Sequence, residues 1–258
     1  MNSYLYPISA SKSNDKFKRF VLTDSYRLRN LKSLLSKNLP VKVDLRESGL
    51  LSSITDQGNM ETSIGIALTN GCLEYAIKRS RNVEYDLSSV FLYQKDRTSF
   101  FPSPGKTVTN FIDAIEILKF KGCSPALLDS YDHSNFNYYP SDNAFGIASI
   151  NRIRKAYRLK SIKDIKHSLS EDNPVACLIE VYPSFFDVFV YRTGMINPPS
   201  SKEKKKGNHA ITIVGYDDEK SHFIVKNCWS KSWGDFGYGY LPYRAFKIMF
   251  VEGYCLKV

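Results

Sequence analysis

The sequence lacks the features that mark several large classes of protein. Its 258 residues contain no uninterrupted apolar run that reaches the length of about 20 residues needed to cross a bilayer. The amino-terminal residues do not combine a charged region with a following apolar run, so no secretory signal is visible. We therefore expect a cytoplasmic protein that has no membrane partner.

Cysteine is scarce and widely spaced in this chain. The 5 cysteines are an odd number and form no Cys-x-x-Cys pair. This spacing fits neither a disulfide framework nor a zinc site, so we expect no metal and no cofactor. The simplest interpretation is a set of reduced packing thiols in a cytosol-like compartment, namely Cys72, Cys123, Cys177, Cys228 and Cys255.

Negative charge is also in short supply. The net charge is +10, and residues 1–40 contribute +6 of it through eight Lys or Arg against two Asp, which leaves +4 for the other 218 residues. A basic extension of this kind meets nucleic acid in some proteins, but no nucleic-acid-binding motif accompanies it, so we favour a solvated extension. A hydrophobic content of 43% with 14% aromatic residues indicates a folded chain with a sizeable core.

The first half of the chain after the extension has helical periodicity. The segment 64–77 is apolar on nearly every side, which predicts a central, buried helix. Asp86 precedes a second predicted helix that carries residues 90–93, and the spacing of apolar residues over 108–120 predicts a third. A short helix within the extension is also expected, from Thr23 to Leu35.

The second half is rich in short apolar segments that predict strands. These segments are 174–182, 210–216, 223–227 and 237–241, separated by turn residues. A lysine-rich stretch, 202–206, leads into His209 and is expected to be a solvated loop. A helix-rich half followed by a strand-rich half predicts two lobes with a binding cleft between them.

Ordered motifs then identify a family. Val43-Asp44-Leu45-Arg46 opens the main domain, Gln57-Gly58 precedes the central helix, and Asn208-His209-Ala210 lies far downstream. Lys121-Gly122-Cys123-Ser124-Pro125, Lys226-Asn227-Cys228-Trp229 and Trp233-Gly234-Asp235-Phe236-Gly237-Tyr238 complete the set. In this order, from about residue 41 to 258, the chain resembles the papain-like cysteine peptidases, especially their short bacterial-type members.

The resemblance implies an α+β, papain-like two-lobed fold, in which a helical lobe packs against a β-barrel-like lobe with the site in the cleft between. The helical lobe would lie mainly in 41–145 and the β-rich lobe mainly in 146–258. Residues 1–40 would occupy the position of a prosegment. In this family a peptide or protein ligand binds in the cleft.

The resemblance also assigns roles to individual residues. Gln57 corresponds to the oxyanion-hole donor, His209 to the base and Asn227 to the residue that orients it, while Trp229 would shield the Asn–His pair from water. In the parent chemistry, a helix dipole and an imidazolium stabilise a thiolate nucleophile, and papain itself is a known case of the low thiol pKa that results.

The chain departs from the family at the nucleophile. Ser63 stands where the resemblance calls for cysteine, and Met60, Glu61 and Ile64 replace other residues of the same motif. A hydroxyl does not ionise near neutral pH, so no ion pair with His209 forms. The Glu61 carboxylate would oppose the negative charge that develops in an oxyanion hole.

These departures leave several functions open. The leading interpretation is a pseudopeptidase that keeps the cleft to bind peptide or protein without turnover. The alternatives are an active hydrolase or acyl transferase that uses Ser63 with His209 and Asn227 on a peptide or ester, and an engineered inactive variant of an active cysteine peptidase. Ser63 also has a purely structural interpretation, as a serine that satisfies a backbone N–H at a helix start.

Overall fold

The computed structural model describes residues 38–84, 86–93, 110–128 and 140–258 of the chain. The helix expected between Thr23 and Leu35, and nearly all of the basic extension 1–40, lie outside the described residues. None of the described helices is both long and apolar enough to span a membrane.

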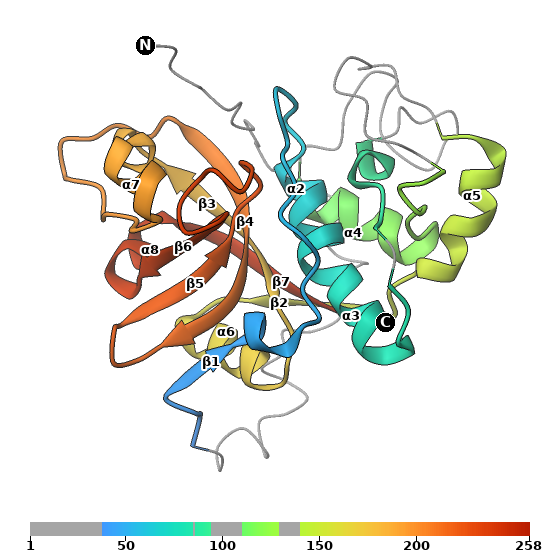
Figure 1. The fold of residues 1–258 in the computed structure, drawn as a ribbon, viewed down its shortest axis with the longest axis horizontal. Coiled ribbons are helices and arrows are strands. Elements are labelled where there is room, and N and C mark those ends of the chain that lie inside the picture. Colours follow the sequence, from blue (N-terminus) through green and yellow to red (C-terminus); the bar gives the residue numbers. More distant parts are fainter. Residues whose placement is uncertain (1–37, 85, 94–109, 129–139) are drawn as a thin grey trace.

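Helices dominate the first part of the described chain (Figure 1). After strand β1 (Lys42–Asp44), the helical elements are η2 (Leu45–Ser48), α2 (Ser63–Ile66), η3 (Ala67–Leu73), α3 (Glu74–Arg81), η4 (Ser89–Tyr93), α4 (Phe111–Phe120), α5 (Asp142–Ala148) and η5 (Ser149–Asn151). The later helices are α6 (Ile162–Ser170), η6 (Pro183–Phe186), α7 (Val188–Thr193) and α8 (Tyr243–Met249).

Strands dominate the second part. They are β2 (Lys155–Leu159), β3 (Val175–Val181), β4 (Gly207–Asp217), β5 (His222–Lys226), β6 (Tyr238–Pro242) and β7 (Phe250–Lys257). Among the described residues, seven strands form one antiparallel sheet in the order β2-β7-β3-β4-β5-β6, with β1 paired to β4. Helices together with an antiparallel sheet confirm the α+β expectation.

The predicted central helix over 64–77 is present and runs further, from Ser63 to Arg81, and its middle is π-helical. Residues 62–75 are all buried. The π-helical segment η3 lies between α2 and α3, and its geometry is visible where Glu74 N–H bonds to the carbonyl of Thr69, five residues back. A π-turn inside an α-helix is uncommon and often lies at a functional site.

Strand β3 shows how the two cores meet at the sheet. Its odd-numbered positions, Val175 to Val181, pack into a core with the helices α6 and α8. Ala176 and Leu178 point to the opposite face and join the core of the central helix with α4. Because side chains of a strand alternate between faces, this strand is buried on both sides. Figure 1 shows α2 and α3 lying between the sheet and the helices α4 and α5.

Three sequence predictions need correction. Residues 89–93 form a 3-10 helix rather than an α-helix, since Phe91 N–H bonds to the carbonyl of Ser88, three residues back, and Ser88 itself is tied to Ser124. The third helix begins at Phe111, where Asn110 accepts the N–H of Asp113 at 2.9 Å as an N-cap.

The third correction concerns the strand after the lysine-rich loop. It begins at Gly207 rather than Ala210, because Gly207 already pairs with Val181 of β3. His209 therefore lies within β4 and not before it. This placement gives the histidine backbone the rigidity of a central strand.

Candidate active site

His209 and Asn227 form a buried pair at the ends of neighbouring strands. His209 lies near the start of β4, and Asn227 follows the last residue of β5. The His209 Nε2 and Asn227 Oδ1 atoms are 2.8 Å apart, and the two residues are 0% and 3% exposed. Antiparallel pairing of β4 with β5 brings these residues together although 18 positions separate them.

The hydrogen bonds determine which imidazole nitrogen carries the proton. Asn227 Oδ1 also accepts the backbone N–H of Cys228 at 2.9 Å, which identifies this atom as the amide oxygen. An oxygen only accepts, so His209 Nε2 must donate and Nδ1 is the unprotonated, basic nitrogen. This is the tautomer that a general base requires, with a third residue holding the ring in place.

The basic nitrogen of His209 is enclosed. Nδ1 is buried and has no hydrogen-bond partner among the described residues. Burial lowers the pKa of His209 from 6.5 to about 4, and the hydrogen bond with Asn227 opposes this shift only in part. The imidazole is therefore neutral at pH 7.

Ser63 lies against the backbone next to His209. It is the first residue of α2 and is 2% exposed. Its Oγ accepts the backbone N–H of Ala210 at 3.3 Å, across 147 positions of sequence. The start of the central helix and the start of β4 are thus in direct contact, and the predicted nucleophile and base lie on these two segments.

Gln57 is fully buried, and both ends of its side-chain amide are hydrogen-bonded. Nε2 donates to the carbonyl of Met60 at 2.9 Å, and Oε1 accepts from the Cys228 thiol at 3.1 Å. The Gln57 backbone N–H also bonds to the Cys228 carbonyl at 2.9 Å. These contacts attach the loop before the central helix to the residue that follows Asn227.

Trp229 covers the histidine. The ring centroids of Trp229 and His209 are 4.6 Å apart, and Phe185 and Phe186 pack on the same indole at 5.5 and 5.7 Å. Trp229 is 2% exposed, so its indole packs on His209 in the interior rather than presenting a face to solvent. Glu61, by contrast, is exposed, and partial burial raises the pKa of its carboxyl.

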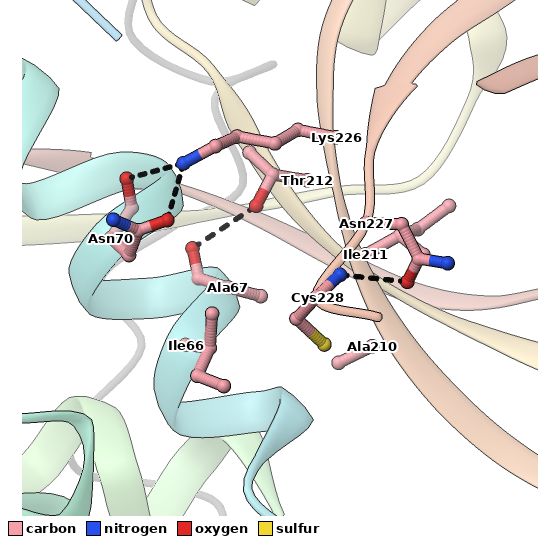
Figure 2. A pocket seen from close by; sticks show the side chains of 9 residues that line it. All are labelled: Ile66, Ala67, Asn70, Ala210, Ile211, Thr212, Lys226, Asn227 and Cys228. Atoms are coloured by element: carbon pink, nitrogen blue, oxygen red, sulfur yellow. Dashed lines mark hydrogen bonds between the residues drawn. The ribbon is translucent and has the colours of Figure 1, made fainter. Parts of the chain in front are cut away.

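The structure also brings in residues that the sequence does not mark as part of a site. The sequence predicts Cys228 to be a packing residue, yet its thiol bonds to Gln57. Lys226 and Asn70 have no predicted role, but both line a cavity of about 10 Å³ that Asn227 and Cys228 also line (Figure 2). The one sequence signal is the position of Lys226, which precedes Asn227 in the Lys-Asn-Cys-Trp motif.

All five cysteines are buried, and none of them forms a disulfide. In the part of the chain that the structure describes, no group of three or more His, Cys, Asp or Glu side chains is arranged to hold a metal ion. Ser63, His209, Asn227 and Gln57 all lie in this region, and their catalytic roles stay predictions.

Comparison with known proteins relates this geometry to one family. A family model described as "Papain family cysteine protease" matches residues 39–248. An uncharacterized peptidase C1-like protein of Acanthamoeba polyphaga mimivirus is 28% identical over 250 residues, which cover 89% of this chain and 79% of that protein. Pro-cathepsin H of Medicago truncatula is 26% identical over 208 residues, covering 78% of this chain but only 56% of the plant protein.

Solved structures show the same fold. Xylellain, a cysteine protease from Xylella fastidiosa, superposes with a TM-score of 0.78 at 23% identity, over 98% of this chain and 96% of that chain. The proCathepsin B S9 of Trypanosoma congolense superposes with a TM-score of 0.71 at 16% identity, over 97% of this chain and 87% of that chain.

Proposed function

Because the chain belongs to the papain family of cysteine proteases and has the papain-like fold, we propose that it is a pseudopeptidase that binds a peptide or protein ligand between its lobes without cleaving it. In this proposal Ser63 occupies the nucleophile position, and the ligand is a polypeptide. His209 and Asn227 keep the geometry of a catalytic base and the residue that orients it.

One observation carries the proposal: the Ser63 hydroxyl oxygen is buried and accepts a backbone N–H from Ala210. A nucleophilic serine must also be able to give its proton to the base, but no hydrogen bond joins Ser63 to His209 Nδ1, which has no partner among the described residues. An oxygen that accepts an N–H from a distant strand and is 2% exposed fits a structural role, in which Ser63 ties the start of the central helix to β4.

The surroundings of Ser63 support the same conclusion. A thiolate is the nucleophile in this family's chemistry, and a serine hydroxyl has no comparable ionised form near pH 7. Low His209 basicity, with a pKa of about 4, makes proton removal from a hydroxyl still harder. One Gln57 Nε2 hydrogen is already donated to the Met60 carbonyl, and the Glu61 carboxylate opposes oxyanion charge.

A second candidate is a hydrolase or acyl transferase in which Ser63 attacks a peptide or an ester. The observation that favours it is the His209 tautomer, because Nδ1 is unprotonated and has no partner among the described residues. This tautomer leaves Nδ1 able to accept a proton from a nucleophile. Rotation of the Ser63 hydroxyl toward Nδ1 would be its first step.

Hydrolysis of a broad fluorogenic peptide and ester library separates the two candidates. The native chain and its Ser63→Ala form are compared, with an intact fold checked by circular dichroism. The proposal predicts no turnover above background in either protein. Turnover by the native chain that disappears in Ser63→Ala would establish the hydrolase instead.

A further inference from the structure

A buried lysine lies beside the candidate site and has no role in the chemistry described above. Lys226 ends β5, is 4% exposed, and precedes Asn227. Its Nζ donates to the backbone carbonyl of Asn70 at 3.3 Å and also to the Asn70 side-chain oxygen (Figure 2). A buried ammonium is costly unless it is paired in this way, so its position calls for an explanation.

Asn70 is also hydrogen-bonded to the buried side chain of Glu74. Its Nδ2 donates to Glu74 Oε2 at 3.0 Å, and Glu74 Oε1 accepts the backbone N–H of Leu87 at 2.8 Å. Glu74 is 5% exposed. Lys226, Asn70 and Glu74 therefore form one continuous hydrogen-bonded chain, which we call the lysine relay.

The lysine relay meets the backbone of the central helix in the π-helical segment, because Asn70 belongs to that segment. Asn70 lies in the middle of η3, and the carbonyl of Ala67 in the same segment accepts from Thr212 Oγ1 at 3.4 Å. Gly71 lies so close to β4 that an added Cβ would overlap Thr212 Oγ1. The helix backbone and two strand side chains are thus in direct contact here.

The two strand side chains that reach the π-helical segment form one cross-strand pair. Thr212 of β4 and Lys226 of β5 are directly opposite each other in the sheet. Thr212 lies three residues after His209, and Lys226 lies one residue before Asn227. The same two strands therefore carry both the contacts to the helix and the His209–Asn227 pair.

We propose that Lys226 is a positioning residue, which through Asn70 fixes the ends of β4 and β5 against the helix that begins at Ser63, and so sets the orientation of the His209–Asn227 pair relative to Ser63. This inference rests on the proposed function only in taking these three residues as one site. It holds whether or not the site turns over substrate.

The charges that face Lys226 come from several elements. Burial lowers the pKa of Lys226 to about 8, while Glu74 and Asp86 from the helical part raise it, as do the thiols of Cys72 and Cys228. The ammonium is therefore protonated at pH 7. The protonated form has three N–H donors, enough to bond both Asn70 oxygens.

The test is nuclear magnetic resonance of the histidine side chains in the native chain and in two variants, Asn70→Ala and Lys226→Met. The Nε2 proton of His209 is buried and bonded to Asn227, so it exchanges slowly with solvent. We expect both variants to speed its exchange at least about tenfold, since looser strand ends open the pair more often. His222, at the other end of β5, and His167, in α6, should keep their spectra.

Matched variants make the outcome decisive. Lys78→Met removes a lysine of the central helix whose Nζ lies 2.8 Å from Glu84 Oε1. This control should leave the exchange rate of the His209 Nε2 proton unchanged. Unchanged exchange in a folded Asn70→Ala protein would overturn the proposal. A response to Lys226→Met but not to Asn70→Ala would also overturn it, because the charge and not the link would then be responsible. If Lys226→Met does not fold, Asn70→Ala alone decides.

Discussion

At the scale of single residues, the oxygen of Ser63 changes the electrostatics of the whole site. With no thiolate to stabilise an imidazolium, burial controls the protonation of His209. The hydrogen bond to Asn227 still fixes the tautomer, so the ring has the orientation of a base but little basicity. Orientation and basicity have separate physical causes here.

His209 should therefore titrate far below the ordinary range of a histidine. We expect its imidazole to stay neutral until the pH approaches about 4. A pH titration that monitors the NMR signals of the His209 ring measures this pKa. Ser63→Cys should raise this pKa, because a thiolate stabilises the imidazolium. A pKa near 6.5 in the native chain would contradict the burial of His209 in a site without an ion-pair partner.

The same shift predicts a dependence of stability on pH. The unfolded chain protonates this imidazole near pH 6.5, whereas the folded chain does so only near pH 4, so the unfolded state binds more protons between these values. The free energy of unfolding should thus fall as the pH falls from about 6.5 to about 4, by at most about 3 kcal/mol from this group.

Urea denaturation of the native chain and of His209→Gln, at several pH values, isolates this contribution. The difference between the two proteins should shrink as the pH is lowered across that interval, since the variant has no imidazole at this position to titrate. A difference that stays constant with pH would show that His209 does not carry the dependence.

At the scale of elements, the central helix is predictable as a buried helix but its π-helical segment is not. Apolar residues on all sides of 64–77 predict burial whatever the hydrogen-bonding pattern. The π-helical segment instead contacts β4 and β5 through Thr212 and Lys226, which are far away in sequence. Periodicity within the helix contains no information about those partners.

The strands show the same limit. Alternating or continuous apolar residues locate β3 to β6 within a few positions, but charged residues interrupt the apolar pattern of β2 and β7, and the sequence analysis does not find them. It also predicts too late a start for β4, because Gly207 and Asn208 favour turns locally, whereas pairing with β3 extends the strand through them. Tertiary pairing overrides local preference at that point.

Gly71→Ala should test how tightly the π-helical segment packs on β4. The new methyl would overlap Thr212 Oγ1, so we expect a loss of about 1–3 kcal/mol in the free energy of unfolding. Part of this loss should be recovered by adding Thr212→Ala, which removes the nearest atom. The measurement is urea denaturation with a double-mutant cycle.

Gly146→Ala is the matched control for this change. Gly146 lies inside α5, and nothing surrounds the position of its Cβ within 4 Å. Alanine there should raise stability by about 0.5–1 kcal/mol, because it restricts the unfolded chain and favours the helix. If Gly71→Ala behaves like Gly146→Ala, the close approach to Thr212 has no energetic consequence.

At the scale of the whole molecule, the site lies where the two cores meet. Ser63 begins a helix whose side chains belong mainly to one core, and Trp229 belongs to the other. Motif order predicts that Gln57, Ser63, His209 and Asn227 come together, and their contacts agree with that grouping, although their catalytic roles stay predictions. The lysine relay is not predictable, because its members belong to no shared sequence pattern.

If Ser63 cannot act as a nucleophile, the protein should bind peptide without cleaving it. The most direct measurement incubates the native chain and Ser63→Ala with a defined peptide pool, isolates the protein-bound fraction by size exclusion, and sequences all peptides by mass spectrometry. We predict that both proteins retain the same subset of peptides with their original termini. New peptide termini produced by the native chain and absent with Ser63→Ala would contradict the claim, as would the failure of both proteins to retain any peptide.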